Sequence, residues 1–413
     1  MNGICAPART ARFIELDSLR GLAALTVVLY HLQILWAQDV HPTSTAVRSL
    51  LTQVAPFGTE AVMLFFVLSG FVLSLPAISG RPQSYFTFTV RRIFRIYVPY
   101  LAAIAVSVAG AFWLHGTVTA SDWFHRSWSE PVNWRLVGQH VLFVGAYNTD
   151  QFDNPIWSLV QEMRISLVFP LLCALVLRLK SGWSFAIIAG LGATALALNK
   201  GPIPIDWRVQ DSVHFAGLFV FGIFLARERD RLGARFLRFP RLARILIGIA
   251  CLWFYLFAGP GLAGFASRLF GSASMDVSQW ITALGAGGLM IVSLNSAWCH
   301  KILTWSPIHF LGKVSYSLYL WHCIVLLYCV HLLYGRMPLG AILCLVLVLI
   351  VPVSWCSYRW IELPSIALGR RLGDNRLTRP EKVKTQGGED HQLAPKQGID
   401  APKRNSVDGT FPA

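Results

Sequence analysis

Apolar stretches long enough to cross a lipid bilayer recur along almost the whole chain, and this repetition restricts the fold more than any other feature. A helix needs about 20 residues to cross a hydrocarbon core of about 30 Å. Spans are predicted at 19–37, 56–78, 93–114, 156–177, 183–199, 212–226, 245–259, 279–298, 314–334 and 339–358. The sequence therefore predicts an all-α, polytopic membrane protein, a bundle of about ten transmembrane helices.

The composition supports a chain embedded in lipid. Charged residues make up 14% of the 413 residues and apolar residues 54%, whereas about a quarter of a soluble domain is charged. The 36 Lys and Arg residues gather in alternate segments between the spans, and the positive-inside rule then places both termini in the cytoplasm. The net charge of +15 is explained by this topology and by attraction to anionic lipid, so nucleic acid is not an expected partner.

The chain divides into a cytoplasmic N-terminus at 1–18, a transmembrane domain at 19–360 and a cytoplasmic tail at 361–413. The tail is too polar to bury enough surface to fold, so it is expected to be largely disordered. In the outer loop 115–155, the stretch 136–147 is apolar but too short to span, which indicates an interfacial or re-entrant segment. All eight cysteines lie in spans or on the cytoplasmic side, so we expect neither disulfides nor a metal site.

Arg20 and His31 lie in the first span, eleven residues apart. At about 100° per residue this spacing is roughly three turns, so both side chains share one helix face. A rise of about 1.5 Å per residue puts Arg20 near the cytoplasmic surface and His31 near mid-bilayer. An ionisable residue at that depth is costly and is a functional candidate. The alternative is a histidine that only hydrogen-bonds a neighbouring helix, with Arg20 snorkelling to the interface.

Two further segments combine small or basic residues. Ser69 and the glycine after it form a small step in an apolar helix, which favours close approach of another helix backbone. Arg91, Arg92 and Arg95 surround the cytoplasmic start of the third span. Arginine binds phosphate through two parallel hydrogen bonds, so this cluster together with Arg20 could hold a nucleotide-bearing donor. The alternative is a topology anchor.

Titratable residues also occur within the fourth and ninth spans. Glu162 and Arg164 each require a partner or a wet cavity, because unpaired charge is unfavourable in a membrane. Glu162 could orient His31 or bind an acceptor hydroxyl, and a purely structural ion pair is equally compatible. Tyr316 and His322 belong to a polar stripe that opens the ninth span. The tyrosine is compatible with an interfacial belt, whereas the histidine is a second titratable candidate.

Taken in this order, the five segments resemble the membrane-bound acyltransferase family 3, the bacterial O-acyltransferases of O-antigen and exopolysaccharide type. The resemblance covers about residues 12–360. Arg20 and His31 match the family's Arg and His separated by ten residues in the first helix. The other matching motifs are Phe65–Gly70, Arg91–Arg95, Trp157–Glu162 and Ser315–His322. Each motif alone is weak, whereas five in the same order are specific.

The resemblance implies an integral membrane O-acyltransferase, an enzyme that transfers groups other than amino-acyl groups. It would move an acyl group, expected to be acetyl, from cytoplasmic acyl-CoA to a hydroxyl of a cell-surface or exported carbohydrate. The expected catalytic residues are His31 and Glu162, with His31 acting as a general base or as a transient acyl carrier. The expected substrate-binding residues are Arg20, Arg91, Arg92, Arg95, Ser69, Tyr316 and His322. Acyl-CoA is expected as a co-substrate, without a permanently bound cofactor.

Further expectations follow from the same resemblance. The partners would be acyl-CoA, a carbohydrate or glycolipid acceptor, membrane lipid and separate glycan-assembly proteins, and the location would be the inner (plasma) membrane of a bacterium. Many members carry a second acidic residue after the one matched by Glu162, whereas this chain has Met163 to Ser166, so acceptor choice would differ.

The competing hypothesis is a transporter or flippase for a lipid-linked glycan, because intramembrane Arg, Glu and His also mark substrate paths. A transporter would not consume acyl-CoA and would more often show paired broken helices in two halves, which the sequence lacks.

Overall fold

The computed structural model describes residues 13–39, 57–116, 123–143, 147–200, 207–258 and 274–374, together with a few isolated positions between these ranges. Helices dominate this part of the chain, and within it the one β-type pairing is an isolated bridge between Tyr334 and Met337. The all-α fold class predicted from the sequence is therefore confirmed.

The long helices are α1 (Ile14–Asp39), α3 (Gly58–Ile78), α4 (Tyr85–Leu114), α6 (Ile156–Arg178), α7 (Trp183–Lys200), α8 (Trp207–Leu237), α9 (Arg241–Trp253), α11 (Ser274–Asn295), α13 (Ser306–Leu333) and α14 (Leu339–Ser357). Short π-helical turns continue two of them, η2 (Phe254–Ala258) after α9 and η4 (Tyr358–Glu362) after α14. The shorter elements are η1 (Phe124–Arg126), α5 (Trp134–Leu142), α12 (Ala297–Leu303) and α15 (Leu363–Asp374).

The described residues contain 9 helical stretches that are long and apolar enough to cross a membrane. A further helix, α7, is apolar over the shorter stretch Trp183–Ala195. Each of the predicted spans overlaps one of these helices, so the prediction of a polytopic membrane protein with about ten transmembrane helices is confirmed. Since a bilayer offers no water to backbone amides, a bundle of helices satisfies every buried N–H and C=O group internally.

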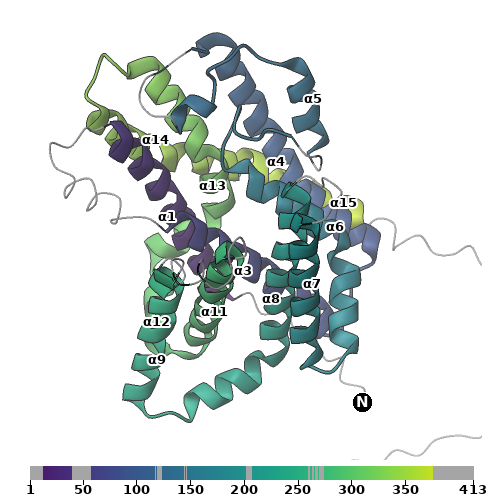
Figure 1. Ribbon diagram of the computed structural model, residues 1–413. Coiled ribbons are helices and arrows are strands. Elements are labelled where there is room, and N and C mark those ends of the chain that lie inside the picture. The colour runs from purple at the N-terminus through teal and green to yellow at the C-terminus, as the bar shows by residue number, and fades with distance from the viewer. Residues whose placement is uncertain are drawn as a thin grey trace, which may run out of the picture. The chain divides into compact units, whose positions relative to one another are not determined.

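The helices α1 and α13 lie side by side (Figure 1). Their backbones touch at two glycines: a Cβ added at Gly21 would lie 2.8 Å from the Cα of Gly312. His31 and His322 each follow their glycine by ten residues, and their rings also meet. Two contacts at the same spacing mean that α1 and α13 run parallel and in register.

A second close approach involves the small step predicted at Ser69. A Cβ added at Gly70 would lie 2.7 Å from the Cα of Phe219, so α3 and α8 pack backbone against backbone. Small residues are the usual means by which membrane helices come this close. This packing holds Ser69 on α3 in a fixed position facing α6.

The connection between α4 and α6 forms a layer over one end of the bundle. Trp128 is fully buried, its Nε1 donates to the Ser107 hydroxyl at 3.0 Å, and its ring occupies the space beside Gly110. The apolar stretch predicted at 136–147 overlaps α5, whose nine residues are too few to span a bilayer. The ring of Trp123 reaches down to His31 of α1.

The folded region extends beyond the boundary predicted at residue 360. Helix α15 packs against α4, where Thr87 Oγ1 donates to the Gly373 carbonyl at 3.1 Å and Arg91 pairs with Asp374. The polar composition of this segment hid the helix, because its stability depends on contacts with α4 that composition does not reveal. Residues 375–413, which make up the rest of the predicted tail, lie outside the described residues.

Candidate active site

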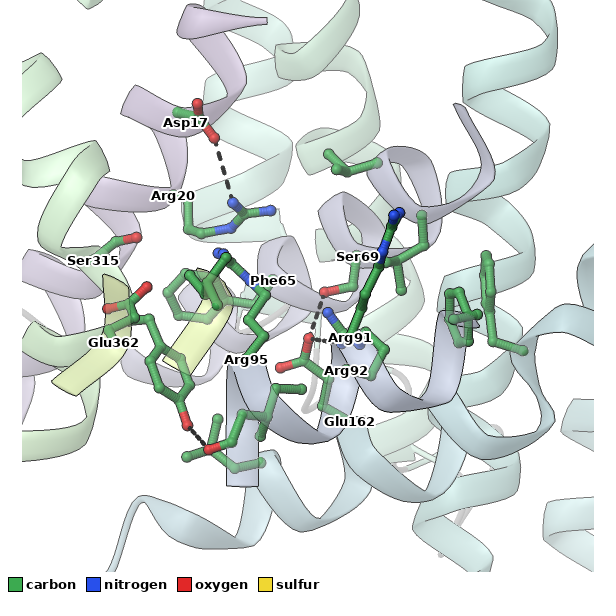
Figure 2. A pocket seen from close by; sticks show the side chains of 18 of the residues that line it. Asp17, Arg20, Phe65, Ser69, Arg91, Arg92, Arg95, Glu162, Ser315 and Glu362 are labelled. Atoms are coloured by element: carbon green, nitrogen blue, oxygen red, sulfur yellow. Dashed lines mark hydrogen bonds and ion pairs between the residues drawn. The ribbon is translucent and has the colours of Figure 1, made fainter. Parts of the chain in front are cut away.

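A cavity of about 880 Å³ opens between α1, α3, α4, α6, α13 and the η4–α15 segment. Figure 2 shows Arg20, Arg95 and Glu362 directed into the same space from three different elements. The charged residues that line it are Asp17, Arg20, Arg91, Arg92, Arg95, Glu162, Lys313, Glu362 and Arg370. Six positive groups and three negative ones leave the lining with an excess of positive charge, which suits an anionic ligand.

The cavity is long and changes character with depth. Along α6 its lining runs from Ser158 to Ala174, which at about 1.5 Å per residue corresponds to roughly 24 Å. One end of the cavity is basic. It is lined by Arg91 of α4, Lys313 of α13 and Arg370 of α15. The other end is formed by apolar and uncharged side chains: Val62, Phe65, Ser158, Leu159 and Tyr319. Such a tunnel fits a ligand with an anionic head and a long, less polar arm.

Arg92 and Glu162 form an ion pair in the wall of the cavity. Arg92 Nη2 lies 2.6 Å from Glu162 Oε1, and the same oxygen accepts a hydrogen bond from the Ser69 hydroxyl at 3.1 Å. The Arg92 guanidinium also donates to the Ser166 hydroxyl at 3.1 and 3.2 Å. Glu162 is therefore committed to Arg92 and Ser69, and the structure shows no contact between Glu162 and His31.

The remaining cationic groups differ in how far they are already neutralised. Arg20 lies 3.5 Å from Asp17, and Arg91 lies 2.6 Å from Asp374. Among the described residues, Arg95, Lys313 and Arg370 form no ion pair, although all three line the cavity. These three groups carry the charge that a phosphate-bearing ligand would meet first.

Tyrosine and serine hydroxyls close the inner part of the cavity. Tyr319 donates to the Pro155 carbonyl at 3.0 Å and shares a 2.6 Å hydrogen bond with the Ser158 hydroxyl. Tyr316 donates to the Ile96 carbonyl at 2.7 Å, which ties α13 to α4. Glu362 accepts a 2.9 Å hydrogen bond from Ser317. The side chain of Tyr319 thus forms part of the inner end of the tunnel.

His31 and His322 form a buried pair next to this inner end. His31 Nδ1 lies 3.0 Å from His322 Nε2 and 2.9 Å from the Val27 carbonyl. His322 Nδ1 lies 2.7 Å from the Tyr319 carbonyl. His31 is absent from the cavity lining, whereas Tyr319 belongs to both the lining and the histidine contacts. The pair therefore lies directly behind Tyr319, beyond the apolar end of the tunnel.

Two residues of the connection between α4 and α6 contact His31. The Trp123 ring lies 5.2 Å from the His31 ring, and the Asn154 side chain hydrogen-bonds to His31. The neighbouring Asp153 is 1% exposed, and both of its carboxylate oxygens are buried without a hydrogen-bond partner among the described residues. Burial raises the pKa of Asp153 well above its usual value of 3.8.

One group of three potential metal ligands occurs among the described residues, namely His31, His322 and Cys323, whose ligand atoms lie within 4.8 Å of one another. The two facing ring nitrogens are separated by an ordinary hydrogen-bond distance. Hydrogen bonding accounts for this contact without an ion between the rings. The seven cysteines among the described residues are all free.

The fold gathers the residues predicted for the site into two places. Arg20, Arg91, Arg92, Arg95, Ser69, Glu162 and Tyr316 line the charged cavity, whereas His31 and His322 form the pair behind it. Arg164 lies apart from both, with hydrogen bonds to Ser212 and to the Gly145 carbonyl.

Sequence reasoning missed Lys313, Tyr319, Glu362 and Arg370 of the cavity, and Trp123 and Asn154 beside His31. Tyr319 stands inside the Ser315–His322 motif, Asn154 lies three residues before the Trp157–Glu162 motif, and Glu362 is a carboxylate just beyond the last predicted span. Lys313 and Arg370 carried no signal of their own.

Comparison with known proteins adds an independent finding. Residues 13–359 match the acyltransferase 3 family, described as an acyltransferase domain. The chain is 24% identical over 367 residues to the "Putative membrane-bound transacylase BcsY" of Komagataeibacter xylinus, covering 84% of this chain and 81% of that protein. It is 24% identical over 344 residues to the peptidoglycan O-acetyltransferase OatA of Listeria monocytogenes, covering 76% of this chain but 50% of that protein. No solved structure matches the chain.

Proposed function

Because the chain belongs to the acyltransferase 3 family, we propose that it moves an acyl group from acyl-CoA to a hydroxyl of a cell-surface or exported carbohydrate. Its long apolar helices and its relatives make it a multi-pass membrane acyltransferase. The identities of the acyl donor, of the acceptor and of the membrane are what we propose beyond this. The membrane is the inner (plasma) membrane of a bacterium, with the Arg20 end of α1 in the cytoplasm.

The observation that carries the proposal is the charged tunnel that ends beside two buried histidines. An acyl-CoA has phosphates at one end and its thioester at the far end of a long, mostly uncharged arm. The unpaired cations Arg95, Lys313 and Arg370 in the lining suit the phosphates, and the apolar end with Phe65 and Leu159 suits the arm. The thioester would then arrive close to Tyr319, in front of the His31–His322 pair.

Two features support a carbohydrate acceptor that reaches His31 from the side opposite the acyl-CoA tunnel. The Listeria relative is a peptidoglycan O-acetyltransferase, so its acceptor is a glycan. In this chain the Trp123 ring and the Asn154 amide contact His31 from the loop before α6. An aromatic ring and an amide are groups that suit a sugar, because the ring packs on its C–H face and the amide binds its hydroxyls.

In the proposed reaction, His31 takes the proton of the acceptor hydroxyl while that oxygen attacks the thioester carbonyl. The carbon–sulfur bond then breaks, and the CoA thiolate receives the proton, so the products are an acyl ester and CoA. In a second version, the unprotonated nitrogen of His31 attacks the thioester carbonyl, and the carbon–sulfur bond breaks to release the CoA thiolate. The acceptor oxygen then takes the acyl group from the imidazole, and the proton of the acceptor hydroxyl passes to the thiolate. In either version, His31 must present an unprotonated ring nitrogen.

The test is transfer of label from radiolabelled acetyl-CoA to cell glycan in membranes that contain wild-type, His31→Ala or His214→Ala protein. His214 is another buried histidine, on α8, and serves as the matched control. We expect transfer by the wild-type and His214→Ala proteins and loss of transfer in His31→Ala at equal protein level. Equal transfer by wild-type and His31→Ala would overturn the role of His31. Absence of transfer by folded wild-type protein would overturn acetyl-CoA as donor.

A further inference from the structure

Three contacts, one between the rings and two to backbone carbonyls, indicate where the ring protons of the histidine pair lie. The Asn154 side chain, which also hydrogen-bonds to His31, has an acceptor oxygen and a donor NH₂ group and so fits either tautomer. The Tyr319 carbonyl can only accept, so His322 Nδ1, 2.7 Å away, carries a proton. A neutral His322 then has a lone pair on Nε2, and this lone pair faces His31 Nδ1 at 3.0 Å. His31 Nδ1 must therefore donate.

The Val27 carbonyl gives the same answer independently. It lies 2.9 Å from His31 Nδ1 and can only accept. A His31 ring with its lone pair on Nδ1 would point that lone pair at the Val27 carbonyl oxygen, which is repulsive. Both carbonyls receive a hydrogen bond only when His31 and His322 are each protonated on Nδ1. His31 Nε2 is then the unprotonated nitrogen.

The two acceptors of His31 Nδ1–H are not equivalent. Within α1, the Val27 carbonyl also accepts the backbone N–H of His31, as the i to i−4 pattern of a helix requires. Among the described residues His322 Nε2 has no such competing donor, and its ring is held in place by the Tyr319 carbonyl on its own helix. When His31 becomes positively charged by accepting a proton, His322 is the acceptor able to take up the stronger hydrogen bond.

We propose that His322 is a positioning residue that fixes His31 as the Nδ1–H tautomer and leaves His31 Nε2 as the reactive atom. The proposal rests on the proposed function of His31 and deepens it, since a general base and an acyl carrier both need a lone pair on that atom. The family resemblance implies that His322 binds substrate. In the structure it is 1% exposed and contacts the reactive histidine.

A series of substitutions at His322 separates positioning from filling of space. Glutamine can place its carbonyl oxygen near the position of Nε2 and so keep the acceptor. Asparagine is too short to do so, and phenylalanine keeps the volume of the ring but offers no acceptor. We expect His322→Asn and His322→Phe to lower kcat about 100-fold, within the range that a base contributes. KM for acetyl-CoA should stay near the wild-type value, and His322→Gln should recover most of kcat.

Two kinetic outcomes would overturn the proposal. One is full activity of His322→Phe, which would mean that the ring only fills space. The other is an equal loss in His322→Gln and His322→Asn, which would mean that the acceptor at Nε2 is not what matters. If instead His31→Ala transfers label as well as wild type does, the proposed function fails, and the kinetic series no longer bears on His322.

A spectroscopic measurement tests the tautomer whatever the acyl donor is. In protein labelled with ¹⁵N-histidine and embedded in lipid bilayers, the signals of His31 are identified by their disappearance in His31→Gln. We expect a protonated Nδ1 and an unprotonated Nε2 for His31 in the wild type, and a mixture of tautomers in His322→Asn. A wild-type His31 that carries its proton on Nε2 would refute the proposal even if the enzyme transfers acetyl groups normally.

Discussion

Gly21 of α1 and Gly312 of α13 lie backbone to backbone, and the His31–His322 contact lies ten residues further along both helices. The glycine contact sets how closely the two parallel helices approach, because a Cβ on Gly312 would also lie 2.6 Å from the Asp17 carbonyl oxygen. About 15 Å separates the glycines from the histidines along the helix axes. The distance between the two ring nitrogens therefore depends on two residues that carry no functional group.

Replacing Gly21 with alanine should separate the two helices and stretch the histidine hydrogen bond. Overpacking of this kind typically costs about 1–3 kcal/mol, and acyl transfer should fall with it. Gly192→Ala on α7 is the matched control, since a Cβ there meets nothing within 4 Å. The measurements are thermal unfolding in detergent and label transfer in membranes. Wild-type stability and activity in Gly21→Ala would show that the helices do not need this approach.

The Arg92–Glu162 pair should stabilise the fold mainly by keeping each charge compensated. With Arg92 and Glu162 side chains only 9% and 19% exposed, removing one partner leaves a nearly buried charge, which costs about 3–5 kcal/mol. Arg92→Met and Glu162→Met should each be strongly destabilised, whereas the double variant should be closer to wild type. Unfolding free energies from denaturant titration in mixed micelles would check this cycle. Purely additive losses in the double variant would show that the two residues are not coupled.

Loss of one unpaired cation at the mouth of the tunnel should weaken donor binding more than catalysis. A hydrogen bond to a charged group contributes about 1.5–3 kcal/mol, so Arg95→Ala, Lys313→Ala and Arg370→Ala should each raise KM for acetyl-CoA about tenfold or more. The effect should shrink at high salt. Arg126→Ala, which removes a 63% exposed arginine from the loop before α5, should leave KM unchanged. An unchanged KM in all three cavity variants would place the donor elsewhere.

Asp153 should make the stability of the protein depend on pH. Burial raises its pKa in the folded state above the ordinary value of 3.8, so the folded state holds the proton more tightly than the unfolded state does. Well below pH 3.8 the carboxyl group is protonated in both the folded and the unfolded state, so the stability does not change with pH through this residue. As pH rises towards the folded-state pKa, the unfolded state ionises first, and the fold is progressively destabilised.

The isosteric Asp153→Asn variant cannot ionise, so its melting temperature should exceed that of wild type at neutral and alkaline pH. The difference should shrink as pH falls towards 4, and a pH series of thermal unfolding measures it. If the two proteins melt in parallel at every pH, Asp153 has no raised pKa in the folded state.

The predictions from sequence were best where a residue's role depends on the helix that contains it. The apolar spans, the alignment of Arg20 with His31 on one face and the close approach at the glycine after Ser69 all follow from helical periodicity and side-chain size. The arginine cluster was correctly associated with Arg20 because both lie at the same end of their helices. The sequence left three roles open for Glu162, namely orienting His31, binding an acceptor hydroxyl or forming a structural ion pair. In the structure Glu162 pairs with Arg92 and lines the cavity.

What needed the tertiary structure were the relationships between distant segments. His322 faces His31 from 291 positions away along the chain, and no periodicity within either helix relates the two. Helix α15 with its Arg370 falls in the segment predicted to be a tail. Its composition is as polar as that of a disordered segment, and its contacts with α4 are visible only in the structure. Tyr319 stood in the Ser315–His322 motif without a role of its own, yet it lies between the tunnel and the histidines.

The sequence by itself determined that the chain crosses a membrane many times, which helix faces are polar, and which family it belongs to. These properties depend on the solvent around each helix and on side chains a few residues apart. The tertiary structure decided which polar faces meet, which charges are already neutralised and how His31 and His322 face each other. Those properties arise from helix–helix contacts, and the contacts are set by packing at positions such as Gly21 and Gly312.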